Sequence, residues 1–100
     1  MPNLKIPESQ LQREIKEYLQ WNGWFVYKNH QSLGSYRGLF DLTAIKNGRV
    51  VWIEVKKPKG KVSPLQQQFL EDIKQHGGEC FVAKGINDVE AYLMAETEGK

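Results

Sequence analysis

The dipeptide Asn47-Gly48 is the feature that most restricts how this chain can fold. It separates two runs of strand-type residues, which we place at about 39–46 and 49–56. A type I′ turn needs positive φ at both of its central residues, and Asn-Gly meets that need with little strain. The sequence therefore predicts a β-hairpin closed by a two-residue turn.

The hairpin also determines which side chains face each other. Counting back from the turn places Asp41 opposite Glu54, and opposed side chains share one face with Cβ atoms about 4.5–5.5 Å apart. Lys56 lies two residues beyond Glu54 and therefore on the same face. The alternate residues should point into a core: Val51, Ile53 and Val55. We thus expect Asp41, Glu54 and Lys56 to cluster, unless a bulge shifts the pairing by one residue.

The other elements follow from hydrophobic periodicity and from capping residues. We predict a helix at 8–21, a strand at 24–28, an exposed loop at 29–38, a helix at 64–76, a strand at 79–83 and a last short helix capped by Asn87. Ser63 and Gln66 form a capping box for the second helix. This order predicts an α/β fold, a mixed central sheet with helices on its faces, in which the helix at 64–76 connects parallel strands.

Composition and size indicate a single domain over residues 1–100. The chain has 40% hydrophobic and 26% charged residues, which is ordinary for a globular protein. The single cysteine, Cys80, excludes an internal disulfide and fits a reducing setting. We find no signal-type N-terminus and no membrane-spanning run, so we expect a cytoplasmic protein. A phage or prophage origin is compatible with this expectation.

Charge is concentrated locally rather than over the whole chain. The formal net charge is only +2, yet four lysines fall between residues 56 and 61. Such a basic loop on a nearly neutral domain is typical of a surface that faces phosphates. We therefore expect DNA-phosphate contacts from Arg37, Lys57, Lys59 and Lys61. A solvated lysine loop is the alternative.

Two opposed carboxylates suggest a metal site. Asp41 and Glu54 would repel each other, and a divalent cation between them would reverse that repulsion. Ligation by oxygen alone suits Mg²⁺ or Mn²⁺. Such an ion lowers the pKa of bound water and stabilises charge on a phosphate, while Lys56 could orient or deprotonate the water. The alternative is that these are solvent-facing charges of an amphipathic strand.

Three short segments together resemble a known nuclease family: Gly38-Leu39-Phe40-Asp41, Glu54-Val55-Lys56 and Ser63-Pro64-Leu65-Gln66. The combination is similar to the virus-type replication-repair nuclease (VRR-NUC) family of the PD-(D/E)xK superfamily, over about residues 8–83. An isolated ExK motif would be weak, whereas the combined motif is specific. The resemblance implies a restriction-endonuclease-like core.

The resemblance also implies roles for individual residues. Asp41 and Glu54 match the family's metal-binding acids, and the Val55 carbonyl is expected to help hold the ion. Lys56 matches the catalytic lysine. Gln66 matches a downstream glutamine that contacts water or phosphate, although the capping box alone would explain a glutamine there. The family's usual proline before the aspartate is Phe40 here, a change that we expect activity to survive.

An acidic residue in the family's first helix most plausibly matches Glu8. Glu8 falls on the apolar stripe of Leu11, Ile15 and Leu19, whereas Glu14 lies about 100° from its centre. An acid on a buried stripe needs a partner, which a metal would supply. A favourable charge in the first helical turn is the alternative. Whether Glu8 or Glu14 is the helix acid stays open.

These inferences predict a metal-dependent DNA endonuclease that uses Mg²⁺ or Mn²⁺ and leaves a 5′-phosphate and a 3′-hydroxyl. Stand-alone members of the family are similar to Holliday-junction resolvases, which implies a homodimer acting on branched DNA. We expect no membrane association and no small-molecule cofactor. The alternatives are a nuclease acting on flaps or linear duplex, a non-catalytic DNA- or RNA-binding module that retains the fold, and a purely structural α/β protein.

Overall fold

A computed structural model describes the backbone of residues 6–98 and the side chains of residues 6–94. Its elements are, in chain order, α1 (Glu8–Trp21), β1 (Phe25–Lys28), β2 (Leu42–Lys46), β3 (Arg49–Val55), α2 (Pro64–Gln75), β4 (Glu79–Ala83) and α3 (Ile86–Glu98). The order of helices and strands is the predicted one.

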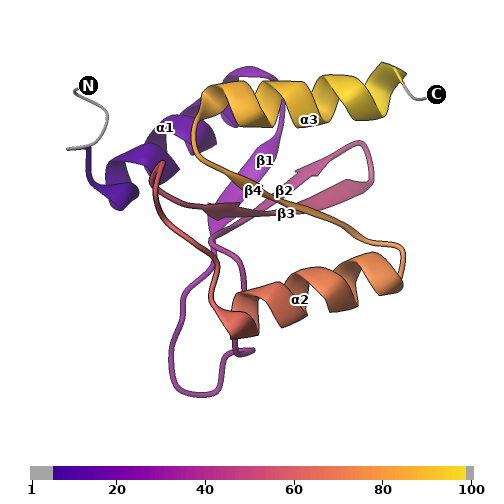
Figure 1. Cartoon of the computed structure of the whole chain (residues 1–100). Coiled ribbons are helices and arrows are strands. Elements are labelled where there is room, and N and C mark those ends of the chain that lie inside the picture. Colours follow the sequence, from indigo (N-terminus) through magenta and orange to yellow (C-terminus); the bar gives the residue numbers. More distant parts are fainter. Residues whose placement is uncertain (1–5, 99–100) are drawn as a thin grey trace.

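The strands form one mixed sheet in the order β1-β2-β3-β4. The pairs β1–β2 and β2–β3 are antiparallel, and β3–β4 is parallel. Helix α2 connects the two parallel strands, as predicted. Figure 1 shows α1 and α3 on one face of the sheet and α2 on the other.

Each face of the sheet has its own hydrophobic core. The larger core lies beneath α1 and α3, and it buries the α1 stripe, Leu11, Ile15 and Leu19, against the sheet residues Val51, Ile53 and Val55. The smaller core lies beneath α2 and is built on Phe40, Phe69 and Cys80. Strand β3 is therefore covered on both faces, which is why a residue such as Glu54 can be fully buried.

The predicted hairpin register is confirmed. Lys46 pairs with Arg49, and the pairing continues without a bulge to Leu42 opposite Ile53. Asn47 and Gly48 have φ values of 52° and 83°, as a type I′ turn requires. The ladder stops there, and Asp41 at the next position donates its N–H to the Glu54 side chain.

The predicted strand at 39–46 is too long at its start, because β2 begins only at Leu42. Its first ladder bonds are replaced by bonds to side chains: the Asp41 N–H donates to the Glu54 carboxylate and not to a backbone carbonyl. The other element boundaries lie within one residue of those predicted, except for the last helix.

The last helix was wrongly predicted in two respects. It has 13 residues rather than being short, and it begins at Ile86, so Asn87 lies inside it. The Asp88 side chain accepts the Lys84 N–H at 2.8 Å, while the Asp88 N–H donates to the Gly85 carbonyl at 3.2 Å. The acid in the third helical position thus ties the segment before the helix to its first turn, as the corresponding residue of a capping box does. In the described part of the chain, no helix is long and apolar enough to cross a bilayer.

Candidate active site

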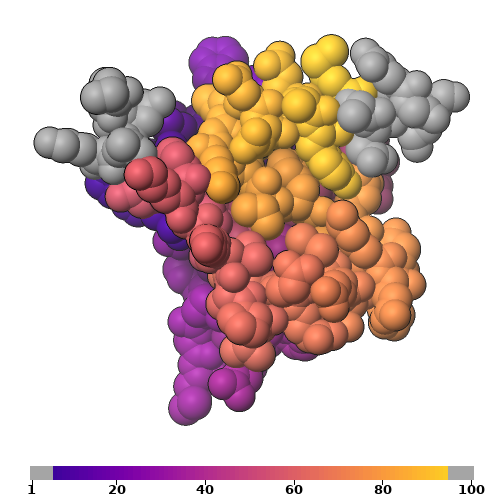
Figure 2. All heavy atoms as spheres, in the orientation of Figure 1, coloured from indigo at the N-terminus to yellow at the C-terminus, as the bar shows by residue number. Residues whose placement is uncertain are grey.

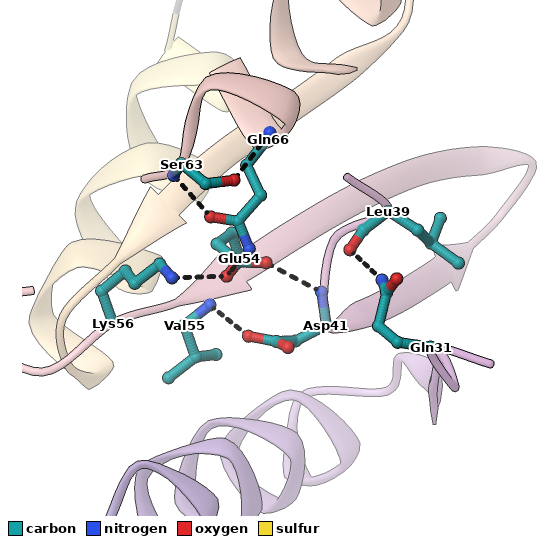
Figure 3. A network of polar contacts seen from close by, with 8 residues as sticks. All are labelled: Gln31, Leu39, Asp41, Glu54, Val55, Lys56, Ser63 and Gln66. Atoms are coloured by element: carbon teal, nitrogen blue, oxygen red, sulfur yellow. Dashed lines mark hydrogen bonds and ion pairs between the residues drawn. The ribbon is translucent and has the colours of Figure 1, made fainter. Parts of the chain in front are cut away.

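Four of the predicted site residues converge at one end of the sheet (Figure 3). Asp41 immediately precedes β2, Glu54 is the next-to-last residue of β3, and Lys56 follows that strand. Gln66 comes from the first turn of α2, across a loop from β3. Segments up to 25 residues apart in the chain therefore meet at this point.

Two hydrogen bonds join Asp41 to the end of β3, one to the Glu54 side chain and one to the Val55 backbone. The Asp41 N–H donates to Glu54 Oε1 at 3.2 Å. In return, Asp41 Oδ2 accepts the N–H of Val55 at 2.9 Å. Each carboxylate thus occupies a position where a strand ladder would place a carbonyl, and both carboxylates are held in fixed orientations.

Glu54 is the most buried acid of the site, with a relative exposure of 1%. Its Oε2 accepts a hydrogen bond from Gln66 Nε2 at 2.7 Å and lies 3.2 Å from the ammonium group of Lys56. The Lys56 side chain is itself 16% exposed. A buried carboxylate with three fixed partners is oriented before any ligand arrives.

Gln66 forms the predicted capping box and also contacts Glu54. Its Oε1 accepts the Ser63 N–H at 2.9 Å, while Ser63 Oγ accepts the Gln66 N–H at 3.1 Å, which completes the predicted capping box. Its Nε2 remains free to reach Glu54. The helix cap therefore fixes the position of the amide that contacts the site.

The pKa values of both acids are raised. Burial is the main cause for Glu54, followed by the charge of Asp41, and together they raise its pKa from 4.5 to about 7 despite the opposing effect of Lys56. Burial also raises the pKa of Asp41, against the lowering effects of the Val55 N–H and of nearby lysines. The raised pKa values show that the surroundings of the two carboxylates supply too little positive charge to balance both when they are ionised.

The donor set fits a hard divalent cation. Burial raises the pKa of both carboxylates, and the charge of Asp41 raises that of Glu54 further, so the pair is stabilised when a cation is added. Lys56 supplies only one positive charge to the pair. The residues present are therefore suited to Mg²⁺ or Mn²⁺, which prefer oxygen ligands.

Glu8 is not brought into this cluster. Among the side chains of residues 6–94, no group of three acid, histidine or cysteine side chains is close enough together to hold a metal ion. Glu8 is half-buried at the start of α1, one helical turn before Gln12, whose side chain lies close enough to Asp41 to lower the pKa of that carboxylate. Glu14 instead accepts a hydrogen bond from Gln10. Of the two acids, Glu8 is thus the one aligned with the site.

The residues predicted to contact DNA lie in the two loops beside the site. Arg37 is exposed in the loop before β2, and Lys59 and Lys61 are exposed in the loop after β3, where Lys57 is half-buried. The space-filling view shows both loops on the same side of the molecule, with residues 29–38 projecting furthest (Figure 2). The Lys84 ammonium group donates to the Pro58 carbonyl at 2.9 Å and thereby holds the second loop.

Asn29 is a positioning residue that sequence reasoning missed. Its backbone N–H donates to the Asp41 carbonyl at 2.7 Å, and its side-chain amide donates to the Phe40 carbonyl at 2.9 Å. Its Oδ1 accepts the Thr43 hydroxyl at 3.0 Å. Asn29 thus holds the backbone on either side of Asp41. A polar residue that ends a strand was a weak signal, because most such residues face solvent.

Gly38 lets the loop before β2 approach α2. Its φ is +83°, and a Cβ atom there would overlap the carbonyl of Leu65 in the first turn of α2. Only glycine suits both conditions. The segment leading to Asp41 is thereby held against the turn that carries Gln66.

Comparison with known proteins gives a consistent result. The model of the VRR-NUC domain family matches residues 4–87. This chain belongs to the VRR-NUC family. No curated protein matches it. A solved structure described as a VRR-NUC domain is 26% identical, covers 87% of this chain and 94% of its own, and superposes with a TM-score of 0.75. Another, described as a VRR-NUC domain protein, has 20% identity, coverage of 89% and 86%, and a TM-score of 0.71, and shows the fold alone.

Membership of the VRR-NUC family identifies this chain as having a nuclease fold. Phe40, which stands where the family usually has proline, is fully buried, and its ring centroid lies 5.0 Å from that of Phe69. It anchors the segment before Asp41 in the core beneath α2, so packing supplies the rigidity that a proline ring would give to the backbone.

Proposed function

We propose that this VRR-NUC chain is a divalent-metal-dependent endonuclease that hydrolyses phosphodiester bonds in DNA. The observation that carries the proposal is the convergence of Asp41, Glu54 and Lys56 at a partly buried end of the sheet. At neutral pH an acid pair with raised pKa values destabilises the fold, unless a bound cation balances its charge. Such perturbed pairs are typical of functional sites.

In this proposal Asp41 and Glu54 hold Mg²⁺ or Mn²⁺, with the Val55 carbonyl and Glu8 as additional candidate ligands. When bound, the ion would lower the pKa of a water molecule and balance charge on the phosphate. The Val55 N–H and the Gln66 amide keep the two carboxylates in place. Their orientation is thus set before the ion binds, which favours tight and selective ligation.

Lys56 is the proposed catalytic residue that assists attack. Its ammonium group lies 3.2 Å from Glu54 Oε2, and from there it can orient the attacking water or neutralise charge that develops on the phosphate. The water oxygen forms a bond to phosphorus while the bond from phosphorus to O3′ breaks. A proton passes to the leaving oxygen, so the products are a 5′-phosphate and a 3′-hydroxyl.

Branched DNA, such as a four-way junction, is the proposed substrate, and a homodimer is the proposed active form. A two-fold dimer presents two identical sites to two strands of a junction. Apolar surface is available for self-association on the edge strand β1, where Phe25 and Tyr27 are 65% and 44% exposed. Light scattering at several protein concentrations would give the oligomeric state, and a strict monomer would contradict this part of the proposal.

A cleavage assay tests the proposed function directly. Four-way junction, flap, nicked and linear duplexes are incubated with Mg²⁺, with Mn²⁺ or with EDTA. We expect metal-dependent cleavage, fastest on the junction, that Asp41→Ala abolishes while DNA binding is retained. Glu71→Gln, a change of an exposed acid on α2, is the matched control and should cleave normally. Faster cleavage of linear duplex than of the junction would contradict the proposed junction selectivity but not the proposed nuclease activity.

Thermal unfolding separates the nuclease from its two rivals. Binding of Mn²⁺ to the native state should raise the melting temperature, and at a hundred times Kd the gain is about 2.7 kcal/mol. Asp41→Ala should remove that gain. A structural protein would show no response to the ion. A binding module would bind DNA without cleaving it under any of the metal conditions.

A further inference from the structure

A small basic cavity adjoins the active site on the side of α1. Its volume is about 180 Å³, and α1, β1 and β2 contribute the residues that line it: Ser9, Gln12, Arg13, Lys16, Lys28 and Leu42. Three of the six are cations, and none is an acid. We call this cavity the α1–β1 groove.

Within the described part of the chain, none of the three groove cations forms a close ion pair. There, the ion pairs join Arg49 to Glu79 and Lys56 to Glu54, and neither involves a groove residue. Arg13 and Lys16 are three positions apart on α1 and therefore neighbours on its surface. Lys28 approaches them from β1. Like charges gathered in this way repel, so the groove favours an anion.

The groove is continuous with the catalytic carboxylates. Gln12 and Lys28 line it, and both lie close enough to Asp41 to lower the pKa of that carboxylate. Leu42, another lining residue, directly follows Asp41 in the chain. An anion in the groove would therefore lie next to the site.

We propose that the α1–β1 groove binds a backbone phosphate of the DNA strand, next to the phosphate that is cleaved. This proposal rests on the proposed function, and it adds Arg13, Lys16 and Lys28 to the DNA-binding surface. Arginine offers paired donors to phosphate oxygens, and lysine contributes a point charge. Phosphate contacts position a protein on DNA without reading its sequence, so the groove sets the register of cleavage.

Salt dependence of binding tests the groove one charge at a time. Affinity for the junction and for linear duplex is measured in EDTA from 50 to 200 mM salt, with Arg13→Gln, Lys16→Gln and Lys28→Gln. The slope of log K against log salt is negative, and each change should make it less steep by about 0.9, because one phosphate contact is lost. The matched control is Lys74→Gln. Lys74 is exposed on α2, about two turns beyond Gln66. This substitution should leave the slope unchanged.

A substrate with one neutral methylphosphonate locates the contact. Neutralising the phosphate that occupies the groove should weaken wild-type binding, but it should not further weaken binding by a variant that combines Arg13→Gln, Lys16→Gln and Lys28→Gln. Glutamine keeps helix propensity in α1, and melting curves confirm that each variant is folded. If the wild type binds and cleaves DNA while the groove variants match Lys74→Gln, the groove proposal is wrong. If the wild type neither binds nor cleaves, the proposed function itself fails.

Discussion

Asp41 is bound to Glu54 and to the next residue of β3 through one backbone and one side-chain group. The Asp41 N–H donates to the Glu54 carboxylate at 3.2 Å, and the Asp41 carboxylate accepts the N–H of Val55 at 2.9 Å. These two hydrogen bonds end the β2–β3 ladder and fix both acids where the strands stop. The two acids of the candidate site are therefore held together by the end of the sheet itself.

Stability should fall as pH rises through the range in which Glu54 titrates. Its pKa is about 7 in the native protein against 4.5 ordinarily. The native state therefore holds a proton that the unfolded chain releases, and stability declines from pH 4.5 to 7 by up to about 3 kcal/mol. The raised pKa of Asp41 acts in the same direction. Melting temperatures without metal, at constant ionic strength, measure this.

Excess Mn²⁺ should reduce that decline, because the ion binds the ionised carboxylates. Replacing Glu54 by glutamine removes its titration, so the melting temperature of Glu54→Gln should vary less between pH 5 and 8. A wild-type melting temperature that rises over this range would contradict the assigned direction.

Replacing Gln66 should impair activity more than its effect on stability explains. Gln66→Ala removes both the helix cap and the contact with Glu54, whereas Ser63→Ala removes the Ser63 hydroxyl part of the cap alone. Loss of a cap costs about 1 kcal/mol, and loss of a partner that orients a metal ligand lowers activity about 10- to 100-fold. Equal activities for the two variants, compared well below their melting temperatures, would show that the Glu54 contact is unimportant.

Gly38→Ala should destabilise the protein and reduce cleavage. The added Cβ atom would overlap the Leu65 carbonyl, and alanine would have to adopt an unfavourable φ of +83°. We therefore expect the free energy of unfolding to fall by about 1–3 kcal/mol. Gly34→Ala is the control, because its φ is +93° but no atom lies within 4 Å of the added Cβ. The difference in unfolding free energy between the two variants isolates the contact with α2. Equal losses would mean that this contact adds nothing.

Asn29→Ala should lower kcat with a smaller change in KM. The substitution removes the bond to the Phe40 carbonyl and leaves the Thr43 hydroxyl without its acceptor, which should cost about 1–3 kcal/mol of stability. The segment carrying Asp41 then loses a support. Thr43→Val, which removes only the hydroxyl, is the matched control and should retain more activity. Cleavage by Asn29→Ala at the wild-type rate would exclude a positioning role.

Local sequence was sufficient wherever neighbouring residues decide the geometry. Asn47-Gly48 determined the turn, and the turn determined the register that brings Asp41 opposite Glu54. Ser63 and Gln66 determined the start of α2. The spacing of Leu11, Ile15 and Leu19 identified the buried face of α1. In each case the interacting groups are a few residues apart or are related by a fixed strand period.

Tertiary structure decided the remainder, because the contacts involved join segments that are distant in the chain. Packing of α2 against β3 brings the Gln66 amide to Glu54, and burial from both faces raises the pKa of that carboxylate. The hold of Asn29 on the Asp41 segment and the convergence of Lys28 with α1 likewise require strands and helices already in place. The sequence by itself determined which acids would meet, and only the assembled fold decided how deeply they are buried and what surrounds them.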